Sequence, residues 1–249
     1  MLDITTVAGN VSHWADLGLK LPAGLTKYSD LLEELKWSAQ KPTPVIDVDK
    51  LNTKNLAATI ETISAELAAA EHHDDAVLRT RRELARAIVR EAGVFVPDAL
   101  EQLRPRFDTE VARYTEAVSK LPTELTSDSL VKAGPDALAA FGVASEAAGF
   151  IAAVDHWLAS LNNLPATAGF QQEPVLRVTA PETMADLRKL EKAGNATKVD
   201  ALVTQVGKVY LAAAQNGIKF QMNIPREAAQ IRAGIDQAEA AAAAKRKGF

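Results

Sequence analysis

One cluster of side chains with a possible binding role is a row of arginines, Arg79, Arg82, Arg86 and Arg90, which we call the arginine stripe. The spacings of three, four and four residues place all of them on one face of a helix. Guanidinium groups in such a row suit the phosphates of a nucleic acid or the carboxylates of an acidic protein. Acidic residues are interleaved with the stripe and few aromatic residues lie nearby to stack on bases, which favours a solvated helix face instead.

A second basic cluster, Lys245-Arg246-Lys247, ends the last predicted helix. Cations at a helix C-terminus interact favourably with the helix dipole, so this is the first interpretation. Contact with an acidic partner is the alternative. The arginine stripe and this basic tail are the candidate partner-binding residues of the chain.

The run His72-His73-Asp74-Asp75 is the only constellation in the sequence that resembles a metal site. His72 and Asp75 would share a helix face, but a site needs three or four ligands oriented by further groups. We therefore predict a solvated polar turn or helix surface, and no metal site. A metal-dependent helical enzyme built on His72, His73 and Asp75 remains a third functional hypothesis.

Nothing in the sequence assembles a catalytic site. The chain has no cysteine, which excludes disulfides, thiol catalysis and cysteine-ligated metals, and it contains none of the common nucleotide-binding, zinc-protease or serine-hydrolase motifs. Glu146 and Asp155 lie in an apolar helix, but nine residues place them on opposite sides of it, so they form no acid/base pair. We predict no catalytic residue and no cofactor.

The composition points to packed helices. Of the 249 residues 47% are hydrophobic and 24% charged, which excludes a disordered polymer, while only 5% are aromatic. Alanine, leucine and valine carry the apolar share, as is typical of helices packed along their lengths. The predicted fold class is mainly α, with long antiparallel helices forming a bundle and a small C-terminal α+β unit.

The strongest pattern is a heptad seam. Its residues recur at alternating spacings of four and three: Leu56, Ile60, Ile63, Leu67, Ala70, Asp74, Val77, Arg81, Leu84 and Ile88. The seam predicts one helix over about 53–92, ended by Gly93 and Pro97, or a hairpin broken at 71–75. Asp74 and Arg81 are its polar positions, and such residues can fix register and partner choice.

Two more long helices follow. One is predicted over 98–120 as an antiparallel neighbour of the first, with a kink or a late start at Pro105. The other begins after a small helix near Ser129, at Gly134-Pro135-Asp136, and is apolar on both faces. It is therefore expected in the middle of the bundle or at a subunit interface, where Gly142 and Gly149 would permit close backbone approach.

The ends of the chain differ from this core. Residues 1–50 are predicted as an irregular N-terminal arm with one short helix ending near Ser38, and Trp14 and Trp37 are expected to anchor it. Residues 51–165 form the helical core domain and 174–249 a small β-α-α-β-α unit. In that unit, period-two alternation predicts strands near 176–179 and 218–224, with helices at 181–193, 197–215 and from Pro225 onward.

Charge is distributed unevenly, at −9 over residues 1–173 and +5 over residues 174–249. This asymmetry suits an acidic partner or head-to-tail contact between copies. The N-terminus lacks the pattern of a secretory signal, and the apolar segment 137–154 contains Glu146, so we expect no membrane span. The expected location is soluble, in the cytoplasm or in a particle assembled there.

The sequence favours a non-catalytic structural or assembly protein acting through helix-mediated self- or partner association. Homo-oligomers or other protein subunits are the expected partners, and a component of a multi-subunit particle such as a phage virion is one form of this hypothesis. The alternative is a nucleic-acid- or acidic-partner-binding helical protein that uses the arginine stripe and the basic tail. No membrane partner is expected.

Overall fold

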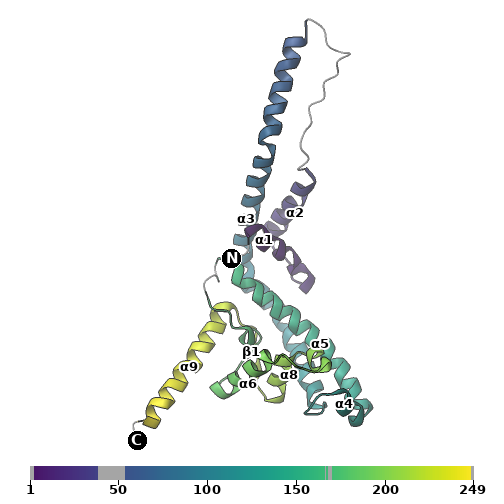
Figure 1. The fold of residues 1–249 in the computed structure, drawn as a ribbon, viewed down its shortest axis with the longest axis vertical. Coiled ribbons are helices and arrows are strands. Elements are labelled where there is room, and N and C mark those ends of the chain that lie inside the picture. Colours follow the sequence, from purple (N-terminus) through teal and green to yellow (C-terminus); the bar gives the residue numbers. More distant parts are fainter. Residues whose placement is uncertain (1–2, 39–53, 166, 168–169, 248–249) are drawn as a thin grey trace. The chain divides into compact units, whose positions relative to one another are not determined.

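The computed structural model describes residues 3–38, 54–165, 167 and 170–247, and its fold is mainly helical (Figure 1). Long helices pack together, and the only sheet among the described residues is a two-stranded antiparallel one near the C-terminus. The predicted fold class is therefore confirmed. The chain divides into two compact units: unit 1 comprises Met1–Ser12 and Leu21–Val94, and unit 2 comprises His13–Lys20 and Phe95–Phe249.

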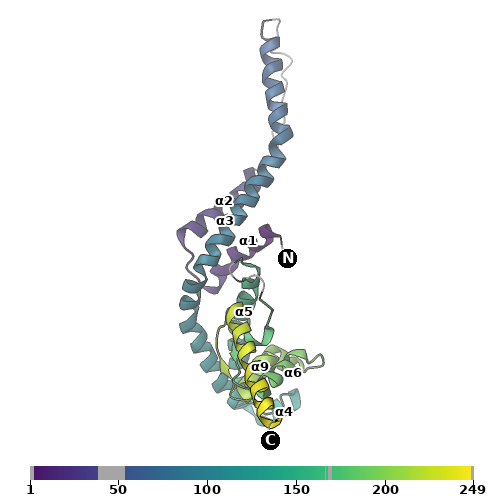
Figure 2. The same ribbon diagram turned by 90° about the vertical axis from the view of Figure 1, so that its left-hand side faces the viewer.

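The longest helix, α3 (Leu56–Ser119), corrects one sequence-based expectation. It runs without a break through 71–75, so the predicted hairpin is wrong and the continuous helix is confirmed there. It also continues through Gly93 and Pro97, where we expected it to end and an antiparallel neighbour to begin (Figures 1 and 2). Residues 56–92 and 98–119 therefore belong to one helix.

Apolar burial explains why α3 continues. Proline lacks the N–H of one helical hydrogen bond and clashes with the preceding turn, at a cost of about 3 kcal/mol. Buried residues recur every three or four positions straight across this point: Ala92, Phe95, Val96, Ala99, Leu103 and Phe107. Since burying one large apolar side chain contributes about 1.5–3 kcal/mol, this row outweighs the lost hydrogen bond.

In unit 1, α1 (Ile4–Ser12) and α2 (Ala23–Ser38) pack with the part of α3 that lies before Phe95. The α1 helix was not predicted, since we expected only one helix in the first fifty residues. Val7, Ala8 and Val11 form its buried face, and Leu25 of α2 is fully buried. The last part of the predicted N-terminal arm, from residue 39 onward, lies outside the described residues, as does the side chain of Trp37.

Unit 2 begins with an aromatic cluster that confirms Trp14 as an anchor. Trp14, in the short helix η1 (His13–Leu17), stacks on Phe95 at 6.4 Å between ring centroids and meets Trp157 edge-on at 5.6 Å. Trp157 belongs to α5 (Pro135–Ser160), which follows α4 (Ser127–Ala133). A reciprocal capping box between Thr126 and Ser129 fixes the start of α4.

Only one face of α5 is buried within unit 2. Its buried residues include Ala144, Ala147, Ile151 and Val154, but Val143 and Leu138 on the other side are exposed. No atom lies within 4 Å of the position that a Cβ would take at Gly142 or Gly149. The expected place in the middle of the bundle is therefore wrong for the described chain, and the close approach at these glycines is not made within it.

The C-terminal part of unit 2 contains the predicted ribbon in shortened form. After the 3₁₀ helices η3 (Leu161–Asn163) and η4 (Pro174–Leu176), β1 (Thr179–Ala180) pairs antiparallel with β2 (Lys219–Phe220). Asn223, which is fully buried, donates its side-chain amide to Leu176 O at 2.6 Å and to Thr179 O at 3.0 Å. These bonds hold the chain after β2 against the chain around β1.

Three helices connect the strands, where two were expected. They are α6 (Met184–Asn195), α7 (Ala201–Gln205) and α8 (Lys208–Gln215). The predicted helix 197–215 is interrupted at Gly207, whose φ of +77° belongs to a region that other residues rarely adopt. Leu187, Leu190 and Ala213 of these helices form a core with Ile235 of the last helix, α9 (Pro225–Lys247).

One helix, Pro135–Asn163, is long and apolar enough to cross a membrane by length and composition alone. It lies in the interior of the sequence and supplies Ile151, Val154 and Leu158 to the core of unit 2. This placement is consistent with a soluble protein.

The structure predicts a high cost for a side chain at residue 207. A Cβ at Gly207 would lie 2.3 Å from a ring carbon of Tyr210, in addition to the strain of its positive φ. We expect Gly207→Ala to lower the free energy of unfolding by about 3 kcal/mol in urea denaturation. Gly217→Ala is the control, because its φ is +65° but nothing lies within 4 Å; it should cost about 1 kcal/mol. If both variants lost the same free energy of unfolding, the predicted clash with Tyr210 would be refuted.

Tyr114 gives a pH-dependent prediction. It is fully buried and donates its hydroxyl to Val206 O at 2.8 Å, and burial raises its pKa above the ordinary value of 10. The unfolded chain therefore loses this proton first as the pH rises above 10, and native stability falls by up to about 1.4 kcal/mol per pH unit. Tyr114→Phe should be about 1 kcal/mol less stable than the wild type at pH 7, and the gap should close near pH 11. If the difference in free energy of unfolding between the wild type and Tyr114→Phe stayed constant from pH 7 to 11, this prediction would be contradicted.

Candidate functional site

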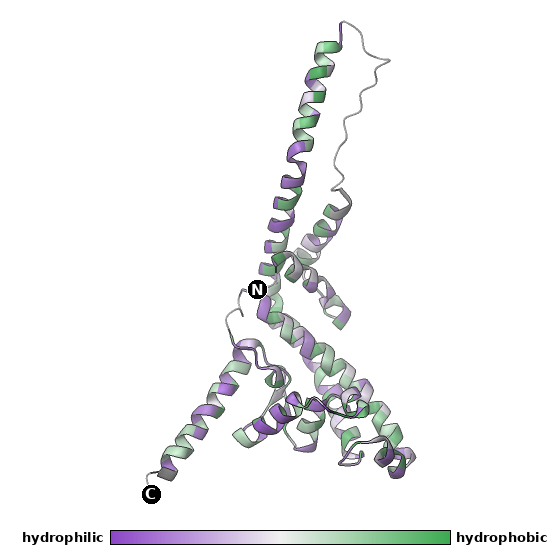
Figure 3. Ribbon diagram, in the orientation of Figure 1, coloured by the Kyte–Doolittle hydropathy of each residue, from purple (hydrophilic) through white to green (hydrophobic). Residues whose placement is uncertain are grey.

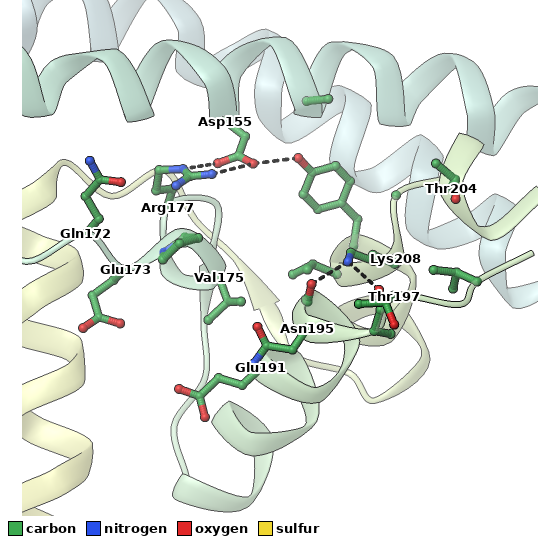
Figure 4. Close-up of a pocket in the computed structure, with 18 of the residues that line it drawn as sticks. Asp155, Gln172, Glu173, Val175, Arg177, Glu191, Asn195, Thr197, Thr204 and Lys208 are labelled. Atoms are coloured by element: carbon green, nitrogen blue, oxygen red, sulfur yellow. Dashed lines mark hydrogen bonds and ion pairs between the residues drawn. The ribbon is translucent and has the colours of Figure 1, made fainter. Parts of the chain in front are cut away.

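Unit 2 contains an open cleft with a volume of about 850 Å³ (Figure 4). Its walls come from α5, the segment around η4, the end of α6, the loop after it, the start of α8, and α9. Its lining includes these polar and charged side chains: Asp155, Gln171, Gln172, Glu173, Arg177, Glu191, Asn195, Lys208, Tyr210 and Arg232.

Asp155 is the centre of the first polar group in the cleft. It points from α5 toward Arg177, which donates Nε to Oδ1 and a terminal nitrogen to Oδ2 at 3.3 Å (Figure 4). The Tyr210 hydroxyl donates to the same Oδ2 at 2.9 Å. Burial is the main cause that raises the pKa of Tyr210, and the neighbouring Asp155 carboxylate raises it further. The tyrosine is therefore held protonated as a hydrogen-bond donor.

Lys208 and Arg232 are also engaged by groups of the protein. The Lys208 ammonium donates to Gly194 O and to Ala196 O at 2.9 Å, so it satisfies carbonyls at the C-terminus of α6. Arg232 of α9 pairs with Glu173 at 3.0 Å and with Glu191 of α6. These contacts connect α6, α9 and the chain before η4.

The described lining of the cleft thus contains three carboxylates and three cations, and two of the cations, Arg177 and Arg232, pair with the carboxylates. Each cation donates to acceptors of the protein, and none of the described lining residues is a histidine. A general base or a nucleophile needs an available lone pair near its substrate. In this arrangement Asp155, Lys208 and Tyr210 hold elements of unit 2 together.

The two carboxylates singled out in the apolar helix have separate partners. Glu146 is exposed and pairs with Arg113 of α3 at 3.0 Å, whereas Asp155 pairs with Arg177. The expectation that they form no acid/base pair agrees with this geometry. Arg177, Lys208, Tyr210 and Arg232 had no role in the sequence analysis. For Arg177, the only signal was its polar position between the apolar residues 176 and 178.

The arginine stripe lies on α3 with all four side chains exposed. Arg86 forms an ion pair with Glu83, and Arg90 lies 3.5 Å from Glu91. Lys245 is exposed near the end of α9, and Arg246 and Lys247 belong to the same helix. Binding of a partner to either cluster remains a prediction.

The histidine–aspartate run lies inside α3. Within the described ranges, no three histidine, aspartate or glutamate side chains are arranged to hold a metal ion. The structure therefore gives His72, His73 and Asp75 no further ligand, and it lends no support to a metal-dependent enzyme at this place.

A different surface stands out in unit 1, the seam on residues 56–78 of α3, which we call the exposed seam. Leu56, Ile60 and Leu67 are 46%, 56% and 55% exposed, and Leu78 beside the seam is 41% exposed. Figure 3 shows apolar residues recurring along this part of the helix. Further along the seam, Ile88 is fully buried among helices of unit 1. The heptad pattern is thus most exposed from Leu56 to Leu67, and Ala70 is already buried.

Asp155 supports the cleft, and this can be tested by its removal. Asp155→Ala leaves the largely buried guanidinium of Arg177 and the hydroxyl of Tyr210 without their acceptor. We expect the free energy of unfolding to fall by about 1–3 kcal/mol in urea denaturation. Glu116→Ala, which removes an exposed pair with Lys120, should change nothing measurable. An Asp155 variant as stable as the Glu116 variant would show that the network is dispensable.

Comparison of the chain with models of known families, with characterised proteins and with solved structures finds no match in any of the three.

Proposed function

We propose that this chain is a non-catalytic structural or assembly protein that acts through helix-mediated association. The observation that carries the proposal is the exposed seam of α3. Heptad-spaced leucine and isoleucine residues are typical of helices that pack against another helix over several turns. Here Leu56, Ile60 and Leu67 lie open over residues 56–67, about 18 Å of helix at 1.5 Å per residue.

The energetics favour a covered seam. Full burial of a leucine or isoleucine side chain contributes about 1.5–3 kcal/mol. Leu56, Ile60 and Leu67 are about half exposed, so each can still gain about 1 kcal/mol from a partner. Most soluble proteins expose single apolar residues, but not a row of them in register on one helix.

A second open surface supports the same proposal. Leu138 and Val143 on α5 are 47% and 37% exposed, and the nearby Gly142 and Gly149 have free space beside them. Glycines on an apolar helix face allow another backbone to approach closely. The chain therefore carries open apolar helix faces in both of its units.

The cleft in unit 2 supports the non-catalytic part of the proposal. Its carboxylates are paired with Arg177 and Arg232, Lys208 donates to main-chain carbonyls, and Tyr210 is held protonated, so these side chains act as structural contacts. A multi-subunit particle, such as a phage virion, is the setting in which we expect such a protein to act.

Sedimentation velocity of the purified chain over a concentration series tests association through the seam. We expect species larger than the monomer, and we expect them to disappear in the double variant Ile60→Asp with Leu67→Asp, which places charges on the seam. Ala58→Asp with Ala65→Asp is the matched control, because both alanines are exposed residues of α3 outside the seam. Wild-type chain that stays monomeric throughout, or loss of association in the control alone, would overturn the proposal.

A further inference from the structure

The charges around the exposed seam restrict what can cover it. Residues 56–78 contain five acidic residues (Glu61, Glu66, Glu71, Asp74 and Asp75) and no lysine or arginine. Glu66 and Glu71 flank the seam at the heptad positions that face a partner helix. A matching, positively charged helix would gain both the apolar contact and favourable electrostatics.

A second copy of α3 does not meet this requirement. In a parallel pair of α3 helices, Glu66 of one copy would lie beside Glu71 of the other, since these flanking positions are five residues apart. Asp74 would also face its own counterpart. In either orientation, pairing of the two 56–78 segments brings five acidic residues against five. Like charges across an interface are destabilising, so another helix must cover the seam.

The distal half of α9, residues 236–247, has the complementary properties. Ile235 is the last residue of this helix that is buried in unit 2, and the described side chains beyond it are exposed, apart from the half-buried Ala242. Ala238 and Ala242 continue the heptad spacing of Ile231 and Ile235, and the helix ends in Lys245-Arg246-Lys247. This half of α9 is therefore an open helix with a small-residue seam and a basic end. Its three cations outnumber two acidic residues, Asp236 and Glu239, which lie near the start of the segment, away from the basic end.

We infer that the distal half of α9 of one copy docks on the exposed seam of α3 of a second copy. This inference rests on the proposed function and names its partner. Leucine and isoleucine of α3 would fill the space that the alanines of α9 leave, since large and small residues in facing positions interdigitate. The three cations at the end of α9 would lie near Glu66 and Glu71. The net charge is −9 over residues 1–173 and +5 over residues 174–249, and these opposite charges also favour contact between α3 of one copy and α9 of another.

This contact joins different surfaces of the two copies. After two copies dock, the copy that contributed its α9 still has a free seam, and the other copy still has a free α9. Further copies can therefore add head to tail. Such heterologous contacts produce rings when the rotation closes and open filaments when it does not. The pairing of several exposed charges makes the association sensitive to salt.

Two blocked variants of the full chain test the inference by complementation. The seam-blocked variant carries Ile60→Asp with Leu67→Asp, and the α9-blocked variant carries Ala238→Asp with Ala242→Asp. Each alone should stay monomeric in sedimentation velocity, since the same defect is present in every copy. An equimolar mixture should form dimers and nothing larger, because one intact α9 meets one intact seam. The dimer also proves that both variants are folded.

The control for α9 is Ala240→Asp with Ala244→Asp, which changes the other side of the helix and should leave association unchanged. Replacing Lys245-Arg246-Lys247 with three glutamates should weaken association about tenfold, and Glu66→Lys with Glu71→Lys in the second copy should restore it.

The outcomes separate the inference from the proposed function. If the wild type associates and the seam-blocked variant does not, while the α9-blocked variant associates like the wild type, the proposed function stands and the α9 inference is wrong. A mixture of the two blocked variants that stays monomeric would also overturn the inference. Monomeric wild type would overturn both.

Discussion

The structure depends on the apolar face of α3, which continues through two prolines. Pro97 and Pro105 each remove a backbone donor, and Gly93 is a poor helix former. The row from Ala92 to Phe107 is nevertheless buried, and burial of its large members exceeds the cost of these residues. The same helix therefore supplies Ile88 to the core of unit 1 and Leu103 and Tyr114 to that of unit 2.

Periodicity made much of the fold predictable. The seam of α3, the small helix near Ser129, Pro135 at the start of α5 and Pro225 at the start of α9 are local features, and the structure contains all of these elements. The predicted break at 93–97 is wrong because the buried residues keep their helical spacing past Gly93 and Pro97, and their burial outweighs the cost of these two residues. At Gly207 the error is the opposite one: the predicted helix 197–215 is interrupted there by a positive φ, which helical spacing does not reveal.

The candidate cleft could be predicted only in part, for a topological reason. Asp155 stands out in the sequence as a charge in an apolar helix, but its partners lie 22 and 55 residues away, at Arg177 and Tyr210. Sequence spacing cannot pair residues that come from different elements of a fold. Lys208 likewise looks like any surface lysine until the C-terminus of α6 is placed beside it. The exposure of the seam over 56–78 also depends on packing, since the pattern alone predicts only that it could be covered.

The charges on the two open helices give the proposed association its selectivity. An apolar seam without flanking charges would pair with its own copy as readily as with any other amphipathic helix. Glu66 and Glu71 make that self-pairing unfavourable, while the basic end of α9 turns the same carboxylates into favourable contacts. The alanines of α9 add little apolar area, so neither helix buries enough surface to associate strongly without the charges. Specific but reversible addition of copies is the behaviour that such a balance produces.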